Sequence, residues 1–223
     1  MGQVYIDGAT MLYSKKERPG ANKFSKIILL ENPHPFSAAL KEIRDILCAS
    51  VSQKCCADDG HRVMSRLDLS EFNAYDKALS EHPSAGNTKI KGIVGQGGCS
   101  TAFLTEENNI FKISDCPLFP SPENMTDAEI PIKERFLFGR SVDRLYGAIE
   151  PLAENTELRP TSFAEYQDAW KKLDERLKRK NPDYEFSKCE FDYDEHHQSQ
   201  LGFSGDTPYL LDHQCIKDRP LVG

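Results

Sequence analysis

The stretch KIKGIVGQGGCSTAFLTEENNIFKIS, residues 89–114, decides the fold expected for this chain. It holds β-prone runs that are separated first by a glycine-rich turn and then by an acidic, amide-rich turn at residues 106–109. The last run, residues 110–113, carries one cation, Lys112, in an otherwise apolar segment. The pattern predicts consecutive strands, with glycines between the first pair and a lysine on the third.

The glycine-rich turn, with Gly95, Gln96, Gly97 and Gly98, suits a nucleotide ligand. Glycines let backbone N–H groups approach phosphates because no Cβ stands in the way. A lysine on a strand adds a fixed positive charge that can face the same phosphates. We therefore expect these four residues and Lys112 to bind a nucleotide. The structural alternative is an ordinary meander with a glycine turn.

The bulk composition narrows the classes of function. The chain has 223 residues and a formal net charge of −7, which argues against a nucleic-acid partner because gripping a phosphate backbone needs clustered Lys and Arg. No apolar run reaches membrane-spanning length and no secretory signal is evident, so we expect a soluble, cytosolic protein. The seven cysteines lack C-x-x-C spacing, a pattern typical of reduced thiols.

Periodicity predicts the elements on either side of this stretch. Residues 1–86 contain short β-prone runs and helical stripes without legible chemistry, so we expect an N-terminal α/β appendage. A helix is predicted from about residue 126 to 145, where Glu134, Phe138 and Leu145 share one face. A further helix begins at a capping box of Ser162 and Glu165. Its apolar stripe comprises Phe163, Tyr166, Trp170, Leu173 and Leu177.

An acidic loop and a hairpin are predicted after this helix. Apolar runs at residues 201–204 and 209–211 are joined by a turn at residues 205–208, which predicts two antiparallel strands. A cluster of acidic residues precedes the first strand, and Asp212 ends the second.

This order of elements resembles the protein-kinase fold. In that fold a Gly-rich loop covers the ATP phosphates, the third strand carries a lysine, and a later hairpin ends in a magnesium-binding aspartate. The resemblance covers residues 89–215 and rests on the order and spacing of elements. Two positions depart from the kinase pattern: Ser100 stands where the last glycine of the loop would be, and Asp212-His213-Gln214 stands where kinases have D-F-G. With little chain after the hairpin, the sequence is most similar to the reduced kinases that some bacterial pathogens inject into host cells.

The resemblance implies a role for individual residues. Lys112 would hold the ATP phosphates and pair with a helical glutamate, for which Glu134 is the first choice and Glu129 the alternative. Asp194 would orient or deprotonate the acceptor hydroxyl, with Asp192 and Glu195 open as alternatives. Magnesium would be bound by Asp212 and by a residue at the place of the kinase asparagine, for which Ser199 is the nominal match and Gln200 the match after a one-residue slip.

The predicted fold class is α+β, with a kinase-like amino lobe (antiparallel sheet plus one helix) at residues 87–160. A reduced helical carboxyl lobe follows at residues 161–223, and the appendage at residues 1–86 precedes both. The implied function is ATP- and Mg²⁺-dependent phosphotransfer to Ser or Thr of a host protein, which acts as substrate or activator. Adenylylation and an inactive pseudokinase or binding module stay open.

A cysteine hydrolase is the rival class. Gln96 closely precedes the glycine-flanked Cys99, a pairing that can serve oxyanion stabilisation and nucleophilic attack. His213 or His197 would be the base, and Asp194 or Asp212 the orienting acid. Against this class, nucleophilic cysteines usually stand at helix N-termini, whereas a strand is predicted after Cys99.

A metal site at the adjacent residues His196 and His197 is a further possibility. Neighbouring side chains on a strand point to opposite faces, so one ion would rarely bind both. Exposed loop histidines are the favoured interpretation.

Overall fold

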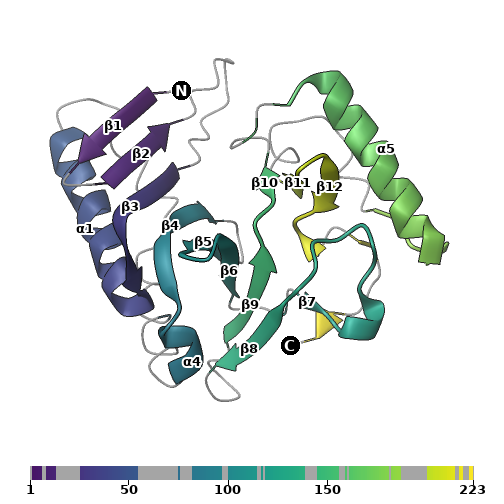
Figure 1. Cartoon of the computed structure of the whole chain (residues 1–223), viewed down its shortest axis with the longest axis horizontal. Coiled ribbons are helices and arrows are strands. Elements are labelled where there is room, and N and C mark those ends of the chain that lie inside the picture. Colours follow the sequence, from purple (N-terminus) through teal and green to yellow (C-terminus); the bar gives the residue numbers. More distant parts are fainter. Residues whose placement is uncertain are drawn as a thin grey trace. The chain divides into compact units, whose positions relative to one another are not determined.

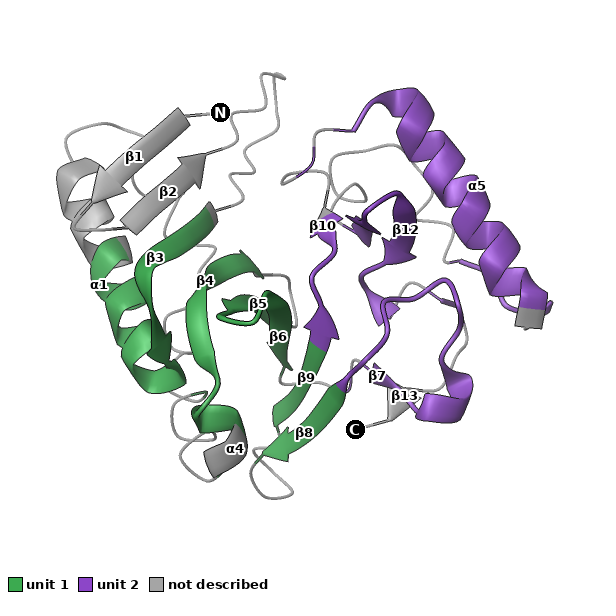
Figure 2. Ribbon diagram, viewed as in Figure 1, with its two compact units in different colours: residues 1–115, 134–149 green, residues 116–133, 150–223 purple. Residues whose placement is uncertain are grey.

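The computed structural model describes residues 2–6, 9–13, 26–54, 75, 82–96, 100–114, 117, 119–138, 145–155, 159, 161–180, 182–186, 200–213, 216–217 and 221–222. The chain is of mixed α+β class, as predicted (Figure 1). It divides into two compact units, the first of residues 1–115 and 134–149 and the second of residues 116–133 and 150–223 (Figure 2). In the part of the chain that the structure describes, no helix combines the length and hydrophobicity needed to cross a bilayer.

Unit 1 is built on an eight-stranded sheet with the strand order β1-β2-β3-β4-β5-β6-β9-β8. The strands predicted within residues 89–114 are β4, β5 and β6, and each pairs antiparallel with the next. The strand bounds are Gly2–Ile6 for β1, Ala9–Tyr13 for β2, Lys26–Pro35 for β3, Lys89–Gln96 for β4, Ser100–Thr105 for β5, Asn109–Ser114 for β6, Glu134–Phe138 for β8 and Leu145–Pro151 for β9.

Strand β4 is irregular, with register shifts against β5 between Ile90 and Gly92 and between Ile93 and Gly95. At each shift β4 advances two residues while β5 advances one, and such a bulge bends the strand and increases its twist. Gly92 meets β3 closely: a Cβ added there would lie 2.0 Å from the carbonyl oxygen of Ile28. Glycine at position 92 therefore allows β3 and β4 to approach each other.

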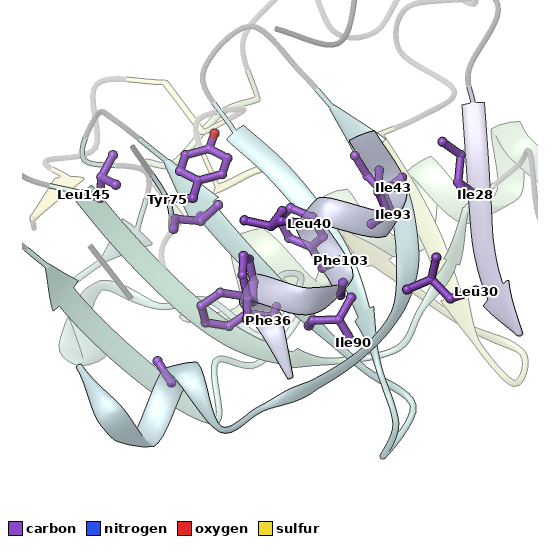
Figure 3. Close-up of a cluster of buried hydrophobic side chains, with 14 of the residues drawn as sticks. Ile28, Leu30, Phe36, Leu40, Ile43, Tyr75, Ile90, Ile93, Phe103 and Leu145 are labelled. Atoms are coloured by element: carbon purple, nitrogen blue, oxygen red, sulfur yellow. The ribbon is translucent and has the colours of Figure 1, made fainter. Parts of the chain in front are cut away.

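Helix α1, Phe36–Lys54, covers one face of this sheet and forms the core of unit 1 (Figure 3). Phe36 is fully buried, and its ring meets Phe103 at 4.8 Å and Phe111 at 5.3 Å between centroids, both edge-on. Tyr75 is buried in the same core, and its hydroxyl lies 3.2 Å from the hydroxyl of Thr101. A short helix, α4 (Pro83–Gly86), precedes β4.

The structure divides the chain elsewhere than at the predicted boundary of residue 86. Strand β3 pairs with β4, with Ile28 opposite Ile93, and α1 packs against both strands. Residues 26–54 therefore share the sheet and the core of residues 89–114. Residues 1–86 were predicted to be an appendage packed on the main unit because no chemistry is legible in them, and sheet pairing across long sequence distances leaves no local signal. The kinase-like amino lobe stays a prediction.

The helix predicted for residues 126–145 is wrong. Residues 134–138 form β8, which pairs antiparallel with β9 and places Glu134 opposite Ile149. Phe136 and Phe138 are buried whereas Leu137 between them is 47% exposed, an alternation of period two. The step from Glu134 to Phe138, one of the three- and four-residue steps that suggested a helix, is also an even step along a strand, and Pro131 removes a backbone N–H that a helix would use.

Unit 2 combines one long helix with short strands, in the sheets β10-β11-β12 and β13-β7. The bounds are Phe119–Pro120 for β7, Pro122–Asn124 for the 3₁₀ helix η1, Glu154–Asn155 for β10, Phe163–Lys180 for α5, Leu201–Ser204 for β11, Thr207–Leu210 for β12 and Leu221–Val222 for β13.

Helix α5 and the hairpin β11–β12 form the core of unit 2, largely as predicted. The helix begins at the capping box: Ser162 Oγ lies 2.7 Å from a carboxylate oxygen of Glu165, which also accepts from the Ser162 N–H. Phe163 is the exception in the predicted stripe, being 50% exposed at the first turn. The hairpin turn has two residues instead of four, with Gly205 in the left-handed region at φ 59°. The buried stripe residues of α5 are Tyr166, Trp170, Leu173 and Leu177.

Candidate functional site

The glycine-rich turn connects two antiparallel strands. Strand β4 ends at Gln96, β5 begins at Ser100, and Gln96 is opposite Thr101 in the register. Gly97, Gly98 and Cys99 lie outside the described residues. The two predicted strands are therefore found, one before and one after these three residues.

Lys112 lies in a row with two small residues. The register places Ala102 opposite Lys112 on one side and opposite Gly95 on the other, so Gly95, Ala102 and Lys112 cross three strands at one level. Directly opposite residues in antiparallel strands share a face. Among the residues that the structure describes, none has an atom within 4 Å of a Cβ added at Gly95. The row therefore combines a half-buried cation with an alanine and with a glycine that no described residue crowds.

Glu134 does not lie on the face of Lys112. Phe111 and Phe136 contact each other in the core under α1, with ring centroids 5.7 Å apart. Side chains alternate along a strand, so Lys112, which follows Phe111, projects from the opposite face, whereas Glu134, two residues before Phe136, shares the face of Phe136. The predicted pair of Lys112 and Glu134 is therefore not formed, and Glu134 is exposed.

Asp212 lies two residues after the end of β12 in unit 2 and is half-buried. The two residues before it form backbone hydrogen bonds to two different segments of unit 2. Leu210 donates its N–H to Ala128 O (2.9 Å) and accepts from Ile130 N–H at 3.0 Å, while Leu211 N–H donates to Gln200 O at 2.8 Å. The carboxylate of Asp212 is thus carried by an ordered strand end.

One carboxylate at this position fits Mg²⁺. This cation usually keeps several waters and binds one or two carboxylates together with substrate phosphates. Among the described residues, no cluster of three or more His, Cys, Asp or Glu forms a metal cage. Gln200 is described and half-buried. The other residues assigned by the resemblance lie outside the described ranges, namely Asp192, Asp194, Glu195 and Ser199.

A buried cluster of ionisable side chains lies next to Asp212. His213 is 2% exposed, its Nδ1 is 2.7 Å from Glu129 Oε1 and its Nε2 is 3.0 Å from Glu150 Oε1. The other carboxylate oxygen of Glu129 accepts from the N–H and the hydroxyl of Thr126, at 2.8 and 2.9 Å. An imidazolium ring, with hydrogen on each nitrogen, satisfies both glutamates at once.

Sequence reasoning missed this cluster. Its members are separated by 84 and 63 residues, so no local spacing joins them. Glu129 was considered only as a partner for Lys112. The one available signal was the position of Glu129 and Glu150 within otherwise apolar runs, AEI and AIEP, where an acid needs a partner if it is buried.

The cluster also bears on the rival cysteine hydrolase. Both ring nitrogens of His213 face carboxylates in unit 2, whereas a general base needs one ring nitrogen turned toward its nucleophile. Ser100, the residue after Cys99 in the sequence, begins a strand, whereas a reactive thiolate is usually stabilised at the N-terminus of a helix. His196 and His197 lie outside the described residues.

Known proteins provide no direct guide to this site. Comparison with family models and with curated protein sequences gives no match to this chain. The candidate groups are therefore the row of Gly95, Ala102 and Lys112 in unit 1, and Asp212 with its buried neighbours in unit 2.

Proposed function

We propose that this protein is an ATP-dependent phosphotransferase that acts on a hydroxyl group of a protein, on a kinase-like arrangement of elements. The observation that carries the proposal is the row of Gly95, Ala102 and Lys112. It gives a lysine on the third strand of a meander whose first turn is glycine-rich, the order that protein kinases use to hold ATP.

The row has the properties that a polyphosphate ligand requires. The charge of Lys112 attracts phosphate oxygens, and the strand fixes the position of its backbone. Ala102 has a small side chain, and none of the described residues lies within 4 Å of a Cβ placed at Gly95, so these residues do not block a ligand on this face of the sheet. Phosphoryl transfer asks a protein mainly for positioning and for neutralisation of charge, and a single well-placed lysine supplies part of both.

Asp212 supports the second half of the proposal. It ends a hairpin that follows a long capped helix, in the order that the kinase fold uses. Its carboxylate would supply one oxygen ligand for Mg²⁺, which when bound neutralises charge on the transferred phosphate. Gln200, whose backbone carbonyl oxygen accepts from Leu211 N–H, is a second candidate ligand at the open end of the same hairpin.

The proposed reaction balances without a further reactant. The substrate hydroxyl oxygen bonds to the γ-phosphorus of ATP, the bond to the β,γ-bridging oxygen breaks, and ADP leaves. The hydroxyl proton passes to a carboxylate of the acidic loop, for which Asp194 is the first candidate and Asp192 and Glu195 are alternatives. As in the effector kinases that the chain resembles, the substrate or an activator would be a host protein.

The test is a pair of transfer assays with ATP labelled at the γ- or the α-phosphate, with Mg²⁺ and a eukaryotic cell lysate. Wild type is compared with Lys112→Ala and Asp212→Ala, and with Glu134→Gln as a matched charge-removing control. Transfer of γ label that both alanine variants abolish is the expected result. Transfer of α label would change the reaction to adenylylation. ATP binding without transfer, weakened by Lys112→Ala, would indicate a pseudokinase. Absence of ATP binding would overturn the proposal.

A further inference from the structure

The buried cluster of Glu129, His213 and Glu150 takes no part in the chemistry proposed above. Three ionisable groups with at most 2% exposure are expensive to remove from water. Such a cluster is kept only where its hydrogen bonds are complete, and each nitrogen of His213 has its carboxylate. The question is what this arrangement holds in place.

We infer that Glu129 and Glu150 clamp His213 and thereby position the adjacent Asp212 for Mg²⁺. The inference rests on the proposed function, because it takes Asp212 as the metal-binding residue. His213 acts here as a positioning residue, and it touches neither nucleotide nor metal.

The restraints bracket Asp212 along the chain. On its N-terminal side the backbone of Leu210 and Leu211 is hydrogen-bonded to residues 128, 130 and 200. On its C-terminal side the ring of His213 is held at both nitrogens. The segment of residues 126–130 takes part in both groups of restraints. Its backbone forms a parallel bridge between Glu129 and Leu210, and the side chain of Glu129 holds the ring of His213.

Two carboxylates hold the ring more firmly than one would. A ring hydrogen-bonded at one nitrogen can still turn about that bond, whereas anchors on Nδ1 and Nε2 fix both its plane and its direction. Phe119 packs edge-on against the same ring at 5.8 Å between centroids. Thr126 in turn fixes the carboxylate of Glu129. Mg²⁺ demands near-ideal octahedral geometry, so a carboxylate held in this way suits it better than one on a loosely held chain.

The test compares Glu150→Gln and His213→Asn in the full-length protein. Glu150→Gln keeps the shape of the side chain and removes its charge, and His213→Asn keeps a single amide donor group in place of the two N–H donors of the ring. ATP affinity is measured by calorimetry with and without Mg²⁺, and amide hydrogen exchange is measured at residues 210–213 in the metal-free protein. His34→Gln is the matched control, because His34 lies 3.0 Å from Glu42 in a half-exposed pair of unit 1.

In both cluster variants we expect ATP affinity without Mg²⁺ to stay as in wild type. The gain in affinity on adding Mg²⁺ should fall by about tenfold or more, the usual effect of losing a group that orients a metal ligand. Exchange at residues 210–213 should become faster. The control should change neither quantity.

The possible results separate the two proposals. If Glu150→Gln folds and keeps the full Mg²⁺ effect, the positioning role is overturned while the phosphotransferase proposal stands. The positioning role is likewise overturned if His213→Asn folds and keeps the full Mg²⁺ effect. If His213→Asn fails to fold, Glu150→Gln alone decides. If wild type shows no Mg²⁺-dependent gain in ATP affinity, the assignment of Asp212 fails, and the positioning role fails with it.

Discussion

At the scale of single residues, two glycines of β4 have opposite surroundings. Gly92 faces the backbone of β3, where a Cβ would lie 2.0 Å from Ile28 O. No described residue crowds a Cβ at Gly95, and its φ lies outside the left-handed region, so the described part of the fold does not demand glycine there. On the proposed function, a bound nucleotide would be the reason for glycine at position 95.

This contrast gives the first prediction. Gly95→Val should leave the melting temperature close to that of wild type, while its side chain occupies the space beside Ala102, in the same row as Lys112, and lowers ATP affinity by about tenfold or more. Gly92→Ala should destabilise the protein by about 1–3 kcal/mol, because the strands must move apart. Thermal unfolding and ATP titration measure the two effects. Unchanged ATP affinity in Gly95→Val would remove the row from the proposed site.

Glu134 gives a second prediction at this scale. It is exposed and lies on the face of β8 opposite to that of Lys112, so Glu134→Gln should change ATP affinity by less than about twofold, whereas Lys112→Ala should weaken it strongly. Fluorescence titration with a labelled nucleotide measures both. An equal loss in the two variants would show that the two side chains act together, contrary to the geometry of the sheet.

At the scale of elements, local signals decided which predictions succeeded. Helix α5 begins where Ser162 and Glu165 predict it, because a capping box acts within four residues. The hairpin β11–β12 likewise follows from a turn between apolar runs. The helix predicted for residues 126–145 failed because its spacing suits a strand equally well, and pairing with β9, which no local pattern reveals, decides the outcome.

The capping box gives a prediction on pH. Hydrogen bonds from the Ser162 side chain and then from its backbone N–H lower the pKa of Glu165 below 4.5. A lowered pKa in the folded state stabilises the fold above the unfolded-state pKa, and this contribution is lost as the pH falls through the folded-state value. Ser162→Ala should therefore destabilise α5 at pH 7, by about 1 kcal/mol for a lost N-cap, and less at pH 3.

Chemical denaturation at the two pH values checks this difference. Ser204→Ala is the control, since Ser204 is an exposed serine at the end of β11. It should show the same small effect at both pH values. A destabilisation by Ser162→Ala that is equal at pH 3 and pH 7 would mean that the ionised form of Glu165 does not support the cap.

At the scale of the whole molecule, the features that sequence reasoning missed are long-range. The sequence predicts β4, β5 and β6, but not that β3 continues their sheet or that Phe36 enters their core. It likewise identifies Asp212, but not the partners that His213 finds 84 and 63 residues away. Burial and pairing bring such residues together, and a single sequence records neither. Residues 187–199, with the candidate Asp194, lie outside the described part of the chain.

The place of the N-terminal region gives the last prediction. If residues 1–86 were an appendage, a chain of residues 87–223 would fold and bind ATP. In the structure, Phe103 and Phe111 pack against Phe36 of α1, and β3 covers the edge of β4. Removing β3 and α1 would expose this apolar face and an unpaired strand edge, which favours aggregation. We therefore expect the shortened chain to lose cooperative unfolding and Lys112-dependent ATP binding.

A point substitution distinguishes the effect of lost core packing from the effect of deleting residues 1–86. Phe36→Ala in the full-length protein should lower the free energy of unfolding by about 3–5 kcal/mol, the usual cost of removing a buried phenylalanine. Phe163→Ala should lower the free energy of unfolding far less, because the Phe163 side chain is already half exposed to water. If residues 87–223 alone unfold cooperatively and bind ATP as the whole chain does, β3 and α1 are dispensable, and residues 1–86 are the appendage that their sequence suggested.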